Sequence, residues 1–273
     1  MANRLLPTKQ RRTRTRAAPP RWGLTTREWR SVQRFRRRAR AVLPNGEMKS
    51  VVLYGSRVYG KPRPGSDIDL FLVYDDVTPE QEQSLKELAL DLDSEFMDVH
   101  VFLYRADRLA RDITVSPLIY NVAHRGILLE GAPLPRLDID RRHVAEKLIK
   151  DAKENLRLVQ PVIDLGGYRN AISMSYYAVL YAADAALATK GFVAKSHAGT
   201  DSLFGNHFFR KGLVDRKFKG LVGRAAEERI KADYDHDVEF NRADAEYWFG
   251  RAQEFVAAID TAMPNWLAEA GEQ

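Results

Sequence analysis

The sequence of 273 residues contains no cysteine. That absence excludes disulfide bonds, thiolate catalysis, and zinc or iron–sulfur sites with cysteine ligands. It also fits a reducing compartment, so we expect a cytoplasmic protein. Long apolar runs are scarce as well: polar residues interrupt the longest one, 171–188, before it reaches the roughly 18–20 apolar residues of a membrane span. We therefore expect no membrane partner.

Acidic residues are almost absent from the first 40 positions, which hold 14 Lys and Arg and the single acid Glu28. The rest of the chain carries 29 Lys and Arg against 36 Asp and Glu. The formal net charge of +6 is thus the sum of a strongly basic N-terminal segment and an acidic remainder of the chain. For this reason the whole-chain charge does not show that the body binds nucleic acid.

The basic leader, residues 1–22, has no apolar periodicity and ends near Pro19-Pro20, so we predict that it is disordered. An arm that binds nucleic acid, a solvated tail and an organellar transit peptide all fit this composition. After it, a Thr25-x-x-Glu28 capping box predicts a basic helix over 26–42. If RNA (tRNA or mRNA) is a partner, the leader and this helix are where we expect it to bind.

The remaining pattern predicts an α+β fold: a mixed sheet with flanking helices, followed by an all-α bundle. Strands are expected at 50–54, 68–74, 97–104 and 127–130, and helices at 79–96, 105–111, 116–124 and then near 140–160, 168–190, 198–211, 213–232 and 241–263. The Gly- and Pro-rich segment after residue 130 is the clearest linker. We divide the chain into a leader (1–22), a first domain (23–131), a linker (132–138) and a helical domain (139–268).

The most informative stretch begins where the first strand ends, at Gly55-Ser56. Glycine allows a sharp turn and a close approach of backbone to phosphate. The Ser56 hydroxyl and nearby N–H groups could hold phosphate oxygens, with charge from Arg57 or Lys61. Ser66 ends the same loop. We assign Gly55, Ser56, Arg57, Lys61 and Ser66 to nucleotide binding.

Three carboxylates accompany this loop. Asp67 and Asp69 stand two apart on a predicted strand, so both point from one face of the sheet, and two such oxygen ligands suit Mg²⁺. Asp98 lies inside a later apolar strand, 97–104, where an unpaired charge is costly unless it serves a site. It could ligate metal or deprotonate an attacking hydroxyl. The alternative is an ordinary Gly-Ser turn with an Asp-x-Asp that caps a strand.

Gly55-Ser56, Asp67-Ile-Asp69 and Asp98 together resemble the DNA polymerase β-type nucleotidyltransferase superfamily, especially its minimal members. The resemblance covers about residues 45–131. It implies a mixed sheet flanked by helices, ATP or another nucleoside triphosphate as substrate, Mg²⁺ as cofactor, and catalytic and metal-binding roles for the three carboxylates.

The helical half resembles the HEPN domain. The segments that carry this resemblance are Tyr168–Ala171, Ser175–Ala178, Ser196-His197 and Arg229–His236. It implies a bundle that tends to form a homodimer, and in many members a metal-independent ribonuclease built on an Arg and a His with four to six residues between them.

Arg229 and His236 have that ribonuclease spacing at its long limit. His236 could deprotonate a 2′-hydroxyl while Arg229 stabilises the developing charge. The alternative is that Arg229 pairs with neighbouring acids and His236 caps the next helix. Related systems adenylylate a HEPN tyrosine that follows the His, whereas Tyr234 precedes it here. We treat His197 as a cap or core residue.

The leading hypothesis is a Mg²⁺-dependent nucleotidyltransferase that moves a nucleoside monophosphate, AMP from ATP, to a hydroxyl on protein, RNA or a small molecule. One alternative is a HEPN ribonuclease toxin fused to its nucleotidyltransferase antitoxin. The other is a non-enzymatic RNA-binding module. The sequence does not identify the acceptor or the nucleobase of the triphosphate, since the carboxylates suit each acceptor and each nucleobase.

Overall fold

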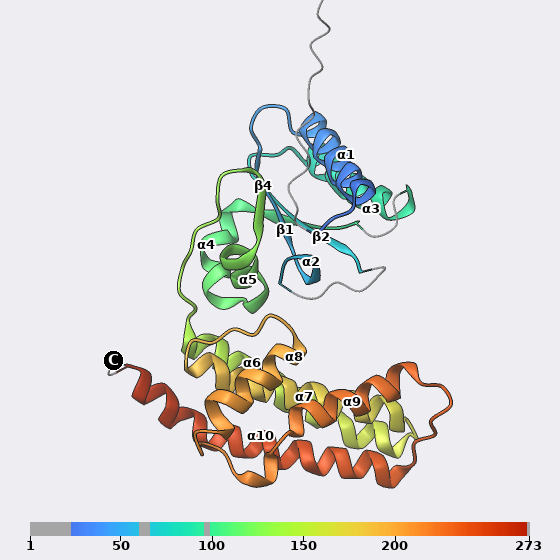
Figure 1. Cartoon of the computed structure of the whole chain (residues 1–273), viewed down its shortest axis with the longest axis vertical. Coiled ribbons are helices and arrows are strands. Elements are labelled where there is room, and N and C mark those ends of the chain that lie inside the picture. Colours follow the sequence, from blue (N-terminus) through green and yellow to red (C-terminus); the bar gives the residue numbers. More distant parts are fainter. Residues whose placement is uncertain (1–22, 60–65, 96–98, 272–273) are drawn as a thin grey trace, which may run out of the picture.

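The computed structural model describes residues 23–59, 66–95 and 99–271. The predicted disorder of the leader falls outside this part of the chain. Two units are visible in Figure 1: a small sheet with its helices, and below it a bundle of helices. The α+β prediction, with a mixed sheet first and an all-α unit after it, is confirmed.

The sheet has four strands in the order β3-β2-β1-β4. They are β1 (Met48–Tyr54), β2 (Ile68–Tyr74), β3 (Val99–Arg105) and β4 (Ile127–Gly131). β1 runs antiparallel to both β2 and β4, whereas β2 and β3 are parallel. All four strands were predicted within two residues of their observed ends, because short apolar runs between turn residues are a strong strand signal.

Alternate residues of the strands point to opposite faces of the sheet. Val51, Leu53 and Leu70 join the core beneath α1 (Thr26–Val42) and α3 (Pro79–Glu95). Val52 and Phe71 join the core beneath α4 (Ala106–Val115) and α5 (Pro117–Arg125). Both central strands are therefore buried on both sides, which is why they read as continuous apolar runs.

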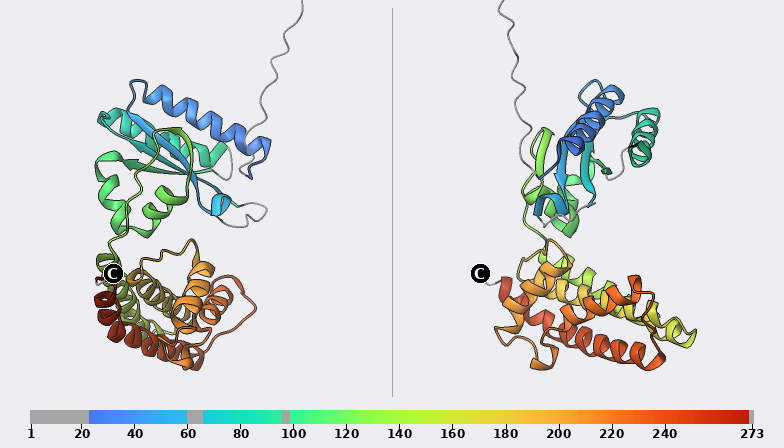
Figure 2. Two further views of the ribbon diagram at one scale, coloured as in Figure 1. Left: turned by 60° about the vertical axis from the view of Figure 1, so that its left-hand side comes forward. Right: turned by 45° about the vertical axis from the view of Figure 1, so that its right-hand side comes forward.

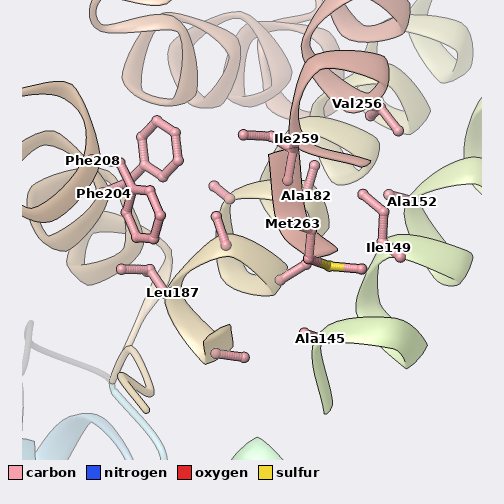
Figure 3. Packing of buried hydrophobic residues seen from close by; sticks show 14 of the residues in the cluster. Ala145, Ile149, Ala152, Ala182, Leu187, Phe204, Phe208, Val256, Ile259 and Met263 are labelled. Carbon is pink, nitrogen blue, oxygen red and sulfur yellow. The ribbon is translucent and has the colours of Figure 1, made fainter. Parts of the chain in front are cut away.

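The bundle consists of α6 (Arg141–Asp164), α7 (Tyr168–Thr189), α8 (His197–Phe204), α9 (Leu221–Tyr234) and α10 (Arg242–Gly271). The alanine-rich α7 lies at its centre, since small side chains let neighbouring helices approach closely. Figure 3 shows Phe204 and Phe208 packing near Leu187, with Ile259 and Met263 of α10 closing the same core.

Several predicted helix ends are wrong. α10 continues through Pro264 to Gly271, and α6 through Pro161. Each proline costs a backbone hydrogen bond, which the burial of Ile163, Trp266 and Leu267 beyond the prolines offsets. The helix predicted over 213–232 begins only at Leu221, because Gly220 adopts a left-handed conformation (φ 63°) after a short 3₁₀ turn.

α7 is long and apolar enough to cross a membrane by length and composition. Of its most apolar 18-residue window, 72% is buried within the bundle. That burial is typical of the core helix of a folded domain.

The two units touch through α5 and the loop between α7 and α8. The Asn121 side chain donates to the Ala194 carbonyl (2.8 Å), and Arg125 donates to the Val193 carbonyl (3.1 Å). The Asp140 N–H, just before α6, donates to the carbonyl of Thr114 (2.7 Å). As a result the α2 turn (Ser56–Tyr59) of the first unit lies toward the α8 end of the bundle in Figures 1 and 2.

Candidate active site

The turn after β1 is built around Gly55. Its φ of 75° is one that side chains disfavour. The pairing of β1 with β2 sets Tyr54 opposite Asp69, so the Asp69 carboxylate lies against the glycine. A Cβ added at Gly55 would lie 1.8 Å from Asp69 Oδ2. Only glycine therefore allows the turn and the carboxylate to occupy this place together.

The Asp69 carboxylate lies beside the turn at Gly55. The backbone N–H of Ser56 donates a hydrogen bond to this carboxylate. Partial burial, followed by the negative charge of Asp67, raises the pKa of Asp69 above its ordinary value. A carboxylate beside a second carboxylate is a place where a cation stabilises the charged form. Gly55, Ser56 and Asp67 thus all lie near the Asp69 carboxylate, and their roles in nucleotide and metal binding stay predictions.

His100 is a residue of this region that the sequence analysis did not consider. Parallel pairing of β2 and β3 sets it opposite Asp69, and its Nδ1 lies 3.7 Å from Asp67 Oδ2. The signal was available: His100 follows Asp98 by two, so both share one face of the strand pattern. Asp98 itself, the third predicted carboxylate, lies outside the described residues.

Arg57 has a clear place in the loop. Its Nη2 lies 2.6 Å from Glu28 Oε1 of α1 and 2.6 Å from the Ser66 carbonyl oxygen. Both side chains of this ion pair are largely buried. In this arrangement Arg57 fastens the loop to α1, and its role in nucleotide binding stays a prediction. Lys61, the other predicted cation, lies outside the described residues.

The donor set suits Mg²⁺. Asp67 and Asp69 offer hard oxygen ligands from one face, and Mg²⁺ is usually held by one or two carboxylates together with substrate phosphates. Among the described residues no group of three or more acidic or histidine side chains forms a complete cage. A Mg²⁺ ion held by Asp67 and Asp69 would therefore need further ligands, such as substrate phosphates or water.

Two half-buried tyrosines, Tyr54 and Tyr59, flank the turn in the sequence. Burial, helped by the charge of Asp69, raises the pKa of Tyr54 to about 12. Burial likewise raises the pKa of Tyr59, the last residue of α2. Both phenols therefore stay neutral near pH 7 and can only donate or accept hydrogen bonds there.

The helical unit gathers a second polar cluster around Arg229 of α9. Its Nη2 donates to the Tyr177 hydroxyl (3.1 Å), and its guanidinium lies 5.7 Å from the Tyr177 ring centre and 5.4 Å from that of Tyr234. Its Nε lies 2.6 Å from Asp233 Oδ2, but without hydrogen-bond geometry. Ser173 donates to the other oxygen of Asp233 (2.5 Å). The interpretation that Arg229 pairs with neighbouring acids is thus confirmed for Asp233.

Among the described residues, His236 is not one of those that contact Arg229. It is exposed on the turn after α9. The idea that it caps the next helix is wrong, because the Asn241 side chain accepts from the Asp244 N–H at the start of α10. His197 is the histidine near Arg229. Burial, followed by the positive charge of Arg229, lowers the pKa of His197. Its Nδ1 lies 2.7 Å from the Tyr176 hydroxyl. Nothing in the residue spacing pointed to this pair, since it depends on how α8 packs against α7.

Arg229→Ala should lower the free energy of unfolding by about 1–3 kcal/mol, since it leaves Asp233 without its counter-charge and Tyr177 without its donor. Arg242→Ala, which removes two exposed salt bridges, to Asp164 and Glu246, should cost less than about 1 kcal/mol. Urea unfolding of both variants measures the difference. Equal losses would mean that the Arg229 cluster contributes no more than a surface ion pair.

Comparison with known proteins agrees with both halves of this description. Residues 33–122 match the nucleotidyltransferase domain family, and residues 145–261 match the HEPN domain family. A protein of Methanocaldococcus jannaschii named "Putative toxin MJ0605" is 32% identical over 131 residues, which are 48% of this chain and 97% of that protein. A UPF0332 protein of Thermotoga maritima is 26% identical over 121 residues, 44% of this chain and 92% of that protein.

A solved structure, spectinomycin adenyltransferase AAD(9) from Enterococcus faecialis with ATP and spectinomycin, is a remote likeness. It aligns with a TM-score of 0.49 and 11% identity, over 84% of this chain and 99% of that one. The matches to the two domain families and to the relatives lead to one conclusion. The chain belongs to the nucleotidyltransferase–HEPN family, with the nucleotidyltransferase domain first and the HEPN domain after it.

Proposed function

We propose that the first domain transfers a nucleoside monophosphate from a nucleoside triphosphate, ATP by preference, to a hydroxyl group. The observation that supports this most directly is the close fit of Gly55 against Asp69, with Asp67 two residues earlier, just before β2 begins. A turn that approaches phosphate next to paired carboxylates suits phosphoryl chemistry, in which positioning and charge stabilisation do most of the work.

In this reaction the acceptor oxygen forms a bond to the α-phosphorus, the bond to the β-phosphate oxygen breaks, and pyrophosphate leaves. The Ser56 hydroxyl and the Arg57 N–H would bind phosphate oxygens, since the N–H groups of Val58 and Tyr59 donate to the Gly55 carbonyl. Asp98 is our candidate for accepting the proton of the acceptor hydroxyl. Asp67 and Asp69 would hold Mg²⁺, which when bound neutralises charge on the phosphates.

The acceptor is a hydroxyl on protein, RNA or a small molecule, and the carboxylates suit each of them. A homodimer through the helical domain and a cytoplasmic location stay predictions. A ribonuclease at Arg229 and His236 has less support, because Arg229 is engaged with Asp233 and Tyr177 while His236 is exposed on a turn.

The test is incubation of the protein with each α-labelled nucleoside triphosphate and Mg²⁺, followed by mass analysis of the protein and of RNA that purifies with it. We expect label or pyrophosphate release with the wild type, and neither with an Asp67→Asn/Asp69→Asn double variant that keeps the wild-type Tm. Equal signals from both proteins would exclude this site. Absence of pyrophosphate release with every triphosphate and acceptor class would contradict the proposal.

A further inference from the structure

α1 presents two different faces. Val32, Phe35 and Ala39 are fully buried against the sheet, so packing fixes how the helix is rotated. At 100° per residue, the centre of the opposite face then carries Arg30 and Arg37, with Arg34, Arg27 and Arg38 following to one side of it. All five are exposed. The helix lies along the outer side of the first domain in Figures 1 and 2, so this face is turned to solvent.

Acids pair with two arginines at one edge of this helix. Arg36 and Arg40 both pair with Glu130 of β4, and Glu28 pairs with Arg57. Within residues 23–59, 66–95 and 99–271, Arg27, Arg30 and Arg37 make no salt bridge. Holding several like charges on one exposed face destabilises the free protein, and an anionic partner removes that cost.

We infer that this outer face of α1 binds the phosphate backbone of a nucleic-acid strand. Arg27 to Arg37 spans ten residues, about 15 Å along the helix axis, which matches a row of successive phosphates rather than a single anion. Arginine suits phosphate because its planar fork can donate two hydrogen bonds. Charge complementarity therefore identifies the partner as an extended polyanion.

The same face argues against a membrane surface. An interfacial helix buries large apolar side chains among the lipids. The exposed large apolar residues of the described chain include none in α1. The basic face also begins next to the candidate active site, since Glu28, between Arg27 and Arg30, is the residue that contacts Arg57 of α2. A bound strand would thus have one end beside that site, although the binding does not depend on the proposed transfer reaction.

The test uses full-length protein and a short labelled single-stranded RNA, with single-stranded DNA as a second probe. Fluorescence anisotropy is measured over a range of salt concentrations for the wild type and for an Arg27→Gln/Arg30→Gln/Arg37→Gln variant. Glutamine keeps helix propensity close to that of arginine. The variant should bind roughly tenfold to a hundredfold more weakly, and its plot of log K against log salt should be shallower by about 2.

A matched variant, Arg142→Gln/Arg210→Gln/Arg216→Gln, removes three exposed charges from the helical domain and should bind nearly as the wild type does. Equal affinity of wild type and α1 variant would overturn the proposal, and so would an equal loss in the matched variant. Vesicles containing phosphatidylglycerol form the last arm. If they bind the wild type more tightly than RNA does, and lose this in the α1 variant, the partner is a membrane surface and the inference is wrong.

Discussion

Gly55→Ala is expected to lower nucleotidyl transfer by at least about a hundredfold, because the new methyl group has to displace the Asp69 carboxylate. An added Cβ meets Asp69 Oδ2 at 1.8 Å, well inside contact distance. A displacement of about 1 Å in a catalytic group is enough for a loss of this size. The left-handed backbone of residue 55 adds about 1–2 kcal/mol of destabilisation. Transfer rates and thermal unfolding measure the two effects separately.

Gly46→Ala is the matched control for this substitution. Gly46 also has a positive φ, 88°, but a Cβ there meets no atom within 4 Å. It should show the backbone cost of about 1–2 kcal/mol and unchanged transfer at temperatures where the protein is folded. If Gly55→Ala were as active as Gly46→Ala, the position of Asp69 would be irrelevant to the reaction, and the proposed site would be wrong.

Asp184→Asn is expected to stabilise the protein at pH 7. Asp184 lies in α7, beside a small cavity lined in part by Pro117, Leu148 and Ala188. Burial raises its pKa to about 6 from 3.8, and the hydrogen bond from Thr200 Oγ1 (2.8 Å) only partly counters this. Asparagine keeps an oxygen that accepts from Thr200 and carries no charge to bury.

The sign of the pH dependence follows from the raised pKa. The folded protein holds the Asp184 proton at pH values where the unfolded chain has released it, so the free energy of unfolding falls as pH rises from about 4 to 6. The loss is roughly 2–3 kcal/mol by pH 7. Urea unfolding at pH 4.5 and 7 should show about two thirds of this decrease for the wild type and a smaller one for Asp184→Asn. Asp138→Asn, at an exposed position, should behave as the wild type does; an identical decrease in all three proteins would contradict the assignment.

The order and type of the elements were predictable because their local signals agree with the fold. The capping box at Thr25 and Glu28 fixed the start of α1, and the structure contains both of its hydrogen bonds. Helix ends at prolines were predicted less well. Local propensity ends a helix near Pro264, but burial of Trp266 beyond it outweighs the lost hydrogen bond.

The site was predictable only where spacing along one chain segment carries the information. Asp67 and Asp69 share a face because a strand alternates. The contact of Arg57 with Glu28 joins residues 29 positions apart and depends on how α1 docks on the sheet. The approach of His197 to Tyr176 depends in the same way on the packing of α8 against α7. Contacts of that kind have no periodic signal in the sequence.

The two hydrogen bonds that Asn121 and Arg125 form across the domain junction depend on side chains from one domain only. Asn121 and Arg125 reach across it, but the groups that receive them are the main-chain oxygens of Ala194 and Val193. Every residue type supplies such an oxygen. Substitutions at 193 and 194 that keep the backbone path should therefore leave these two bonds intact, whereas changes at 121 or 125 remove them. These two bonds therefore constrain the residue types at 121 and 125 but not those at 193 and 194, so correlated substitutions should not mark this contact.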